Sequence, residues 1–375
     1  MSEWRATTWG SVIELQRGFD ITKSEQCLTG EVPVVSSGGI SSYHDKSMAE
    51  GPGVVIGRKG TLGRVHFVED DYWPHDTTLW VKDFKGNDKR FVYYSLQQLD
   101  TDHFNVGSAS PTLNRNHVYP LPVIWPENVG VQRAIAEVLG ALDDKIAANE
   151  RVVSTAETLA DALFHQSSSD ISPGPSAFQD VASVEGGGTP KTKVEEYWGD
   201  GVAWATPTDV TQLSGVYLYD TSRKLTEAGL DACSSRLHPA GSILMTSRAT
   251  IGALAIAAVP MAVNQGFIVA NATDPDGQWW LYHEMKSRVP EFLNFANGAT
   301  FMELPRGKFK QIPARWPGEG KLRSFNVAVS EIHERGRAAG VESASLARTR
   351  DELLPLLMNG KITVKDAEAV VSDAV

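Results

Sequence analysis

Basic and amide-bearing side chains recur in the glycine- and serine-containing turns of this 375-residue chain. Those of the first half are Arg58, Lys59, Arg64, Ser110, Asn114 and Arg115. Those of the second half are Lys191, Lys193, Ser247, Arg248, Asn264, Gln265, Arg306 and Lys308. Arginine reads guanine and asparagine or glutamine reads adenine in the major groove of DNA, whereas lysine, serine and backbone amides hold phosphates. These residues are therefore candidates for contacts with double-stranded DNA, although any single basic turn is more often plain solvated surface.

The sequence carries no recognisable catalytic motif. Residues 51–57 are rich in glycine, but no Gly-Lys-Ser/Thr follows at the spacing of a phosphate-binding loop. The Gly-x-Ser-x-Gly turn of hydrolases and the Pro-Pro-Tyr/Phe tetrapeptide of amino-methyltransferases are both missing, and no Cys/His cluster has zinc spacing. We therefore predict that the chain has no catalytic residue, no metal and no cofactor of its own.

The elements that must position these turns occur twice along the sequence. Residues 12–18 resemble 181–187, and residues 53–63, ending in Thr-Leu-Gly, resemble 241–252, ending in Thr-Ile-Gly. Four further pairs share one constant separation: Leu113 with Leu304, Pro122 with Pro313, Trp125 with Trp316, and Pro126 with Pro317. Short apolar runs at 54–56 and 243–245 look like buried strands. A diverged duplication of one strand-and-turn module is the simplest interpretation.

A long helix follows each Trp-Pro pair, because apolar residues there recur at heptad spacing. The seam predicted for the first helix consists of Ile135, Leu139, Leu142, Ile146, Asn149 and Val153. The seam predicted for the second consists of Phe325, Val329, Ile332, Leu346 and Leu353. Asn149 either fixes the register of the pair or lies at its edge. Small residues at Gly336 and Ala339 weaken the second seam or allow close approach, so two ordinary amphipathic core helices stay an alternative.

We therefore predict an α+β fold: two similar mixed α/β domains separated by a long antiparallel two-helix coiled coil, as a pseudo-two-fold repeat. The predicted segments are a first domain at 1–126, a first spacer helix at 127–166, a second domain at 167–317 that begins with a linker at 167–176, a second spacer helix at 318–359 and a C-terminal tail at 360–375. A helical stub at 364–371 in that tail should be peripheral or frayed.

Composition narrows the class of protein further. The formal net charge of −11 argues against a free-standing nucleic-acid binder, so DNA contacts need local basic clusters and a partner that supplies positive charge. Only Cys27 and Cys233 are present, which is too few for a disulfide framework and fits a reducing cytoplasm. The start has no signal-peptide shape, and no apolar run is long enough to span a membrane.

With these features the chain resembles the specificity subunit of type I restriction-modification systems. The resemblance rests on the twofold pattern, in which each Leu…Pro-x-x-Trp-Pro module end leads into a long helix. It also rests on residues 131–139 of the first helix, which begin Val-Gln-Arg-Ala-Ile, and on the helix ending at 353–362. The second helix departs from the family, since Lys-Leu-Arg-Ser-Phe stands at 321–325 where Gln-Arg-Ala-Ile is expected.

The resemblance implies a non-catalytic subunit whose two target-recognition domains each read one half of a bipartite, asymmetric DNA site. It implies that the helices set the half-site spacing and dock two modification (methyltransferase) subunits, which bring S-adenosylmethionine, and that restriction (translocase/endonuclease) subunits join the complex. It does not predict the bases read, the gap length or whether an active restriction subunit exists. Two other interpretations are a duplicated protein-interaction scaffold without DNA readout and, less well supported, a nuclease or modification enzyme.

Overall fold

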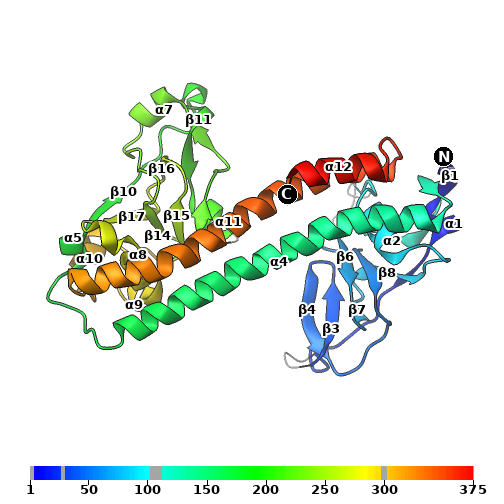
Figure 1. The fold of residues 1–375 in the computed structure, drawn as a ribbon, viewed down its shortest axis with the longest axis horizontal. Helices are drawn as coiled ribbons and strands as arrows, with labels where there is room; N and C mark the ends of the chain where they lie inside the picture. Colours follow the sequence, from blue (N-terminus) through cyan, green and yellow to red (C-terminus); the bar gives the residue numbers. More distant parts are fainter. Residues whose placement is uncertain (1–3, 27–29, 102–111, 214, 297–301, 375) are drawn as a thin grey trace. The chain divides into compact units, whose positions relative to one another are not determined.

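The computed structural model describes residues 4–26, 30–101, 112–213, 215–296 and 302–374, so Cys27 and Ser110 lie outside the described residues. The chain divides into two compact units (Figure 1). Unit 1 comprises Met1–Ala147 and Ser343–Val375, and unit 2 comprises Ala148–Glu342. Both units mix helices and strands, as the sequence predicts.

Unit 1 contains a four-stranded antiparallel sheet in which the inner strand β5 (Gly53–Gly57), called its central strand below, consists only of glycine and apolar residues. Its order is β2 (Glu14–Arg17), β8 (Thr78–Asp83), β5 and β6 (Val65–Val68). All five residues of β5 are buried, which confirms the strand predicted at 54–56. The other strands are β1 (Trp4–Thr8) paired with β9 (Pro122–Pro126), and the sheet of β4 (Gly39–His44), β3 (Val32–Ser36) and β7 (Trp73–Pro74). Short helices are α1 (Trp9–Val12), α2 (Lys89–Leu96) and α3 (Arg115–Val118).

Unit 2 contains a five-stranded sheet and a three-stranded sheet. The larger has the order β10 (Ala182–Gly186), β17 (Phe267–Ala272), β14 (Ile243–Thr246), β15 (Leu254–Ala257) and β12 (Tyr217–Leu218). The smaller has the order β13 (Lys224–Leu225), β11 (Trp198–Ala205) and β16 (Met261–Val263). Helices are α5 (Phe178–Val181), α6 (Pro207–Thr211), α7 (Glu227–Asp231), α8 (Gln278–Ser287), α9 (Val289–Asn294) and α10 (Arg306–Gln311), with 3-10 turns η2 (Glu195–Tyr197) and η3 (Pro275–Gly277).

The two units share one topology, which confirms the predicted duplication. In the larger sheets Arg17 pairs with Leu79 in unit 1, and Gly186 pairs with Ile268 in unit 2. In the smaller sheets β3 is antiparallel to β4 and parallel to β7, while β11 is antiparallel to β13 and parallel to β16. Strand β12 is an addition in unit 2.

The turn that follows the central strand repeats in backbone detail. The Gly63 amide donates to the carbonyl at the end of β5, and the Gly252 amide does the same at the end of β14, both at 2.9 Å. Gly63 and Gly252 have positive φ, and so do Gly60 and Ala249 earlier in each turn. The left-handed conformation costs a residue with a side chain about 1–2 kcal/mol, so Ala249 retains the turn geometry at a cost that glycine avoids.

Two helices of 40 residues each, α4 (Val129–Ser168) and α11 (Glu319–Met358), contribute to both units. Within unit 1, Ile135, Leu139 and Leu142 of α4 are buried in one cluster with Leu346 and Leu353 of α11. The predicted seam residues of this half therefore pack together, and the half-buried Ile146 packs against the same cluster.

Within unit 2, the contact between the same helices changes character. Ala160 and Phe164 of α4 are buried with Phe325 and Val329 of α11. The predicted seam residues Val153 and Ile332 are half-buried, and buried Asn149 donates from Nδ2 to Glu342 Oε2 at 2.9 Å. A Cβ added to Gly336 would lie 3.4 Å from the Cβ of Ala156 and 4.0 Å from the Cα of Val153, so the small residues do permit close approach.

Two boundary expectations need correction. Helix α4 continues to Ser168, into the segment predicted as linker. Helix α12 (Val364–Ala374) is longer than the predicted stub, and the expectation that it is peripheral is wrong. Ala367 is fully buried in the core of unit 1, with Ile362, Val364 and Val371 packed against that core. Val364, Ala367 and Val371 lie at helical spacing, so docking removes this stripe from water, whereas Val370 stays exposed. None of the helices in the described ranges is long and apolar enough to cross a membrane.

Candidate nucleic-acid interface

Each unit carries a polar groove at the edge of its larger sheet. Groove 1, in unit 1, has a volume of about 570 Å³, and its lining residues are Gln16, Arg17, Gly18, Phe19, Asp20, Arg58, Leu79, Asn114 and Arg115. Groove 2, in unit 2, has a volume of about 370 Å³, and its lining residues are Gly186, Gly187, Ser247, Arg248, Gln265, Phe267, Glu303, Leu304, Pro305, Arg306 and Gly307. In both units the groove forms where a strand end, the turn after the central strand and the start of a short helix meet.

Hydrogen bonds show that the grooves occupy the same place in the shared topology. The Leu113 amide donates to the Arg58 carbonyl at 2.9 Å, and the Leu304 amide donates to the Ser247 carbonyl at 2.9 Å. Arg58 and Ser247 are therefore equivalent positions. By the same criterion Lys59, rather than Arg58, is the counterpart of Arg248.

The neighbouring positions match in the same way. The amide-to-carbonyl bonds of unit 1 are Arg58 to Thr77 and Phe19 to Pro74, and their counterparts in unit 2 are Ser247 to Gly266 and Gly188 to Val263. Helices α3 and α10 begin with Arg115 and Arg306. The five matched pairs that matter below are Arg17 and Gly186, Asp20 and Thr189, Arg58 and Ser247, Asp76 and Gln265, and Arg115 and Arg306.

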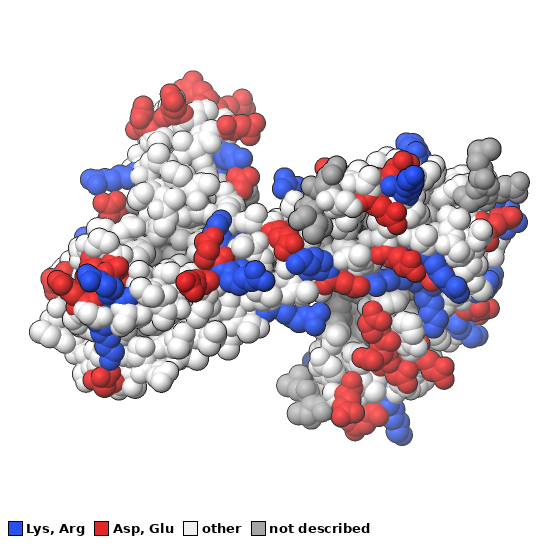
Figure 2. All heavy atoms as spheres, in the orientation of Figure 1, with Lys and Arg blue, Asp and Glu red and all other residues white. Residues whose placement is uncertain are grey.

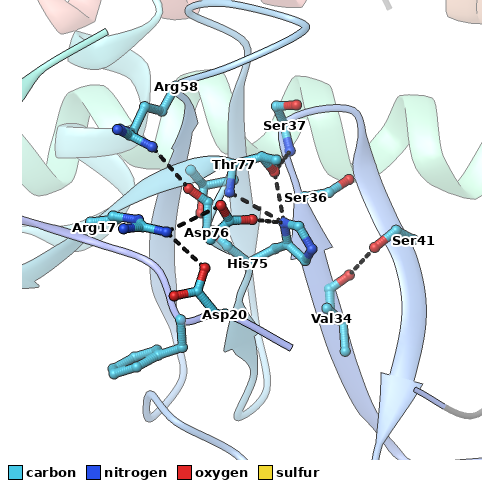
Figure 3. A network of polar contacts seen from close by, with 12 residues as sticks. Arg17, Asp20, Val34, Ser36, Ser37, Ser41, Arg58, His75, Asp76 and Thr77 are labelled. Atoms are coloured by element: carbon cyan, nitrogen blue, oxygen red, sulfur yellow. Dashed lines mark hydrogen bonds and ion pairs between the residues drawn. The ribbon is translucent and has the colours of Figure 1, made fainter. Parts of the chain in front are cut away.

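Groove 1 is built around a guanidinium held by two carboxylates (Figure 3). Arg17 Nη2 lies 2.7 Å from Asp20 Oδ1 and 3.2 Å from Asp76 Oδ2. Asp76 Oδ1 lies 3.0 Å from His75 Nδ1, and Arg58 Nη1 donates to the Asp76 carbonyl at 3.3 Å. The Arg17 side chain is 49% exposed, so the carboxylates orient it while it still faces solvent.

Groove 2 replaces this charged network with a neutral one. Thr189 Oγ1 donates to Gln265 Oε1 at 2.5 Å. A Cβ on Gly186 would lie 2.2 Å from Arg306 Nη1, so the guanidinium of Arg306 lies over the Gly186 backbone. At the rim, Arg248 Nη2 pairs with Glu303 Oε1 at 2.9 Å.

The structure brings together only some of the predicted DNA-contacting residues. Groove 1 holds Arg58, Asn114 and Arg115, and groove 2 holds Ser247, Arg248, Gln265 and Arg306. Five others are exposed but line neither groove: Lys59, Arg64, Lys191, Lys193 and Lys308.

Three of the predicted side chains are less available for contact with DNA, two because of hydrogen bonds to the backbone and one because of burial. Asn264 Oδ1 accepts from the amide of Gly266 at 2.8 Å, so it stabilises its own turn. Asn114 likewise caps α3, since its side chain accepts from the Asn116 amide. Ser247 is only 3% exposed.

Sequence reasoning missed four residues of the two networks: Arg17, Asp20, Asp76 and Thr189. The recognised similarity of 12–18 to 181–187 places Arg17 opposite Gly186 and was the one available signal. Surface charge gives no further guide, because Lys and Arg are interspersed with Asp and Glu on the face shown in Figure 2.

A separate polar cluster lies where α4, α8 and α11 meet inside unit 2, and its two histidines, His283 and His333, are buried. His283 Nδ1 lies 2.8 Å from Asp161 Oδ1, and its Nε2 lies 2.9 Å from His333 Nε2. Lys286 also pairs with Asp161, at 2.9 Å, and the Trp279 ring stacks on His333 at 3.7 Å. This geometry fits two neutral imidazoles, with His283 donating to the carboxylate and accepting from His333.

Burial and neighbouring charge explain the titration of this cluster. Desolvation, followed by the charge of His283, lowers the pKa of His333 to about 3. Desolvation also lowers the pKa of His283, although the hydrogen bond to Asp161 opposes it. Burial alone would raise the pKa of Asp161, but hydrogen bonds from His283 and Lys286 outweigh it and hold the value at about 2.

A second buried network ties α8 to the end of the second module. Glu284 is fully buried, and its carboxylate accepts from Arg288 Nη1 at 2.9 Å and from Arg315 Nε at 2.8 Å. The backbone amide of Arg315 donates to the same carboxylate at 3.0 Å. This buried ion-pair network stabilises the contact between α8 and the end of the module. Removing one arginine would leave the Glu284 carboxylate buried with part of its charge uncompensated, which is strongly destabilising. Within the described ranges, no three His, Cys, Asp or Glu side chains group closely enough to hold a metal ion.

Comparison with known proteins places these features in a family. The type I restriction modification DNA specificity domain matches residues 1–157 and again 175–317. The two matched segments cover most of the chain, one per module, and the chain belongs to this family. The resemblance inferred from the sequence is therefore confirmed.

Individual relatives agree with that assignment. The chain is 39% identical over 156 residues to the type I restriction enzyme MjaIX specificity subunit of Methanocaldococcus jannaschii, covering 40% of this chain and 36% of the relative. It is 28% identical over 189 residues to the HindI specificity subunit of Haemophilus influenzae, covering 50% of this chain and 41% of the relative. The matched part thus spans well under half of either curated relative.

The fold has a solved counterpart. A crystal structure of the type I restriction-modification S subunit from M. genitalium aligns with a TM-score of 0.65 at 16% identity, covering 95% of this chain and 96% of the other. At this identity the similarity supports the fold alone.

Proposed function

We propose that this chain is the DNA-sequence-specificity subunit of a type I restriction-modification complex, and that each module reads one half of a bipartite, asymmetric site. The observation that carries the proposal is that groove 1 and groove 2 have equivalent backbone positions but different side chains. A duplicated scaffold with diverged polar linings suits a protein that must recognise two different base sequences. In this proposal the partner subunits carry out catalysis and bind S-adenosylmethionine.

In this proposal the target-recognition domains are 1–126 and 167–317, and the spacer helices are 127–166 and 318–359, paired antiparallel as a coiled coil, with a C-terminal tail at 360–375. The burial of α4 against α11 within each unit supports such a pairing. The 40-residue length of each helix suits a rod that sets half-site spacing, about 60 Å at 1.5 Å per residue.

The helices also offer a docking surface for two modification subunits, with restriction subunits joining the assembly. Within unit 2, α4 and α11 line an apolar groove of about 470 Å³ whose lining residues are Arg151, Val152, Thr155, Ala156, Leu159, Glu331, Ile332 and Arg335. Leu159, which is 48% exposed, lies in this groove beside the apolar side chains of Val152, Ala156 and Ile332, and a partner helix could cover them together. A partner that contributes basic residues would also offset the net charge of −11 near phosphates.

A module exchange tests the proposal. Residues 1–126 are replaced by the corresponding module of a specificity subunit with a known target, and the complex is expressed with its modification subunit. Methylation sequencing of host DNA should show one half-site replaced and the other retained, because each module reads its half independently. An unchanged methylation motif contradicts the proposal. Absence of salt-dependent DNA binding by the wild-type complex would favour a protein-interaction scaffold instead.

A further inference from the structure

The matched groove positions carry different chemistry in the two units, although their backbones agree. The network of groove 1 contains Arg17, Asp20 and Asp76, and the equivalent residues of groove 2 are Gly186, Thr189 and Gln265. Asp20 and Asp76 both contact Arg17, so the loss of the arginine at Gly186 is accompanied by the loss of both carboxylates at Thr189 and Gln265. The three positions therefore change as one set between the two units, from charged to neutral.

The carboxylates of groove 1 favour contact with a DNA base over contact with a phosphate. A phosphate site gathers cations without nearby acids, because carboxylates repel the phosphate oxygens. Asp20 and Asp76 both contact Arg17 Nη2, and no residue in the described ranges bonds to Nη1, so the half-exposed guanidinium keeps Nη1 as a donor for one further acceptor. An arginine fixed in this way presents donors to neutral acceptors, and the O6 and N7 atoms of guanine are the major-groove acceptors that arginine recognises.

Groove 2 has a side-chain amide, that of Gln265, at the position equivalent to Asp76 in groove 1. Gln265 is exposed, and the bond from Thr189 fixes its Oε1 while leaving the Nε2 hydrogens available. Adenine offers one acceptor and one donor in the major groove, and a glutamine amide complements both. Arg306, lying over Gly186, occupies the space that the Arg17 side chain fills in groove 1.

We propose that Arg17, oriented by Asp20 and Asp76, specifies a guanine in one half-site, and that Gln265, oriented by Thr189, specifies an adenine in the other. This inference rests on the proposed function and adds the reading residues and the bases. Arg17, Asp20, Asp76 and Thr189 are its new assignments.

The test selects DNA with the full chain assembled with its modification subunit, from a library of random-sequence duplexes, and sequences the retained DNA. Arg17→Lys keeps the charge but replaces the planar guanidinium, which two carboxylates orient, by a flexible ammonium, and the preference for one guanine in one half-site should fall about tenfold or more. Gln265→Glu loses the amide donor and should replace an adenine in the other half-site by cytosine, whose N4 amine donates to a carboxylate. Asp20→Asn with Asp76→Asn should relax the same guanine as Arg17→Lys.

Matched controls lie outside the grooves. Lys82→Gln removes an exposed charge from β8, and Gln311→Glu makes the same chemical change at an exposed position of α10. Both should select the wild-type motif. If the wild-type complex selects no motif, the proposed function fails. If it selects a motif and Arg17→Lys and Gln265→Glu select the same one, the function stands and this inference is overturned.

Discussion

At the residue scale, the Asp161–His283–His333 cluster makes the stability of unit 2 depend on pH. Burial holds the folded-state pKa of both histidines below the ordinary value of 6.5, so protonation favours the unfolded chain. The stabilisation is fully present above pH 6.5 and is lost as pH falls toward about 3. Asp161 stays ionised in this window because its pKa is about 2. We expect the His333 contribution alone to lower the free energy of unfolding by about 2 kcal/mol between pH 7 and 5, and His283 to add to this fall.

The variant His333→Gln removes one of the two titrating groups while keeping a polar side chain beside His283. Urea unfolding at a series of pH values should show a shallower slope for this variant than for the wild type. The exposed His165 on α4 provides the control, since His165→Gln should leave the slope unchanged. Equal slopes for His333→Gln and the wild type would contradict the account of the cluster.

At the element scale, Gly336 sets how closely α11 approaches α4 within unit 2. A methyl group fits, because the added Cβ would lie at 3.4 Å from Ala156, and alanine favours the helix over glycine. Gly336→Ala should therefore stabilise the protein by about 0.5–1 kcal/mol, whereas Gly336→Leu should overpack the contact and cost about 1–3 kcal/mol. Urea unfolding measures both changes.

Gly340→Ala serves as the comparison for that pair, since its added Cβ would lie 3.9 Å from Val153 Cγ2 and has more room. It should stabilise like Gly336→Ala. A Gly336→Leu protein as stable as the wild type would show that the two helices do not approach closely at this level.

At the scale of the whole molecule, the proposed spacer makes a quantitative prediction. Adding one heptad to both α4 and α11 lengthens each helix by about 10 Å, which is about three base pairs of duplex. Methylation sequencing should show a gap longer by about that number, with both half-sites unchanged. A heptad added to α4 alone should mismatch the helix pair and abolish methylation. If the double insertion leaves the gap length unchanged, the helices do not set it.

Features that depend on local pattern could be predicted from the order of the residues. Heptad spacing predicted both long helices, and the recurrence of Thr-Leu-Gly near Gly63 as Thr-Ile-Gly near Gly252 predicted two modules of one topology. These inferences succeed because helix periodicity and turn geometry are encoded in consecutive residues. The docking of α12 was not predicted, because its apolar face becomes informative only when a core to cover is known.

Which side chains contact one another could be seen only once the chain had folded. Arg17, Asp20 and Asp76 come from a strand end, the segment after it and a distant loop, and nothing in their spacing shows that they touch. His283 and His333 likewise meet only because α8 packs against α11. Contacts between distant segments depend on packing and side-chain direction, which sequence spacing does not record. The grooves, with the base preferences proposed for them, therefore follow from how the modules fold.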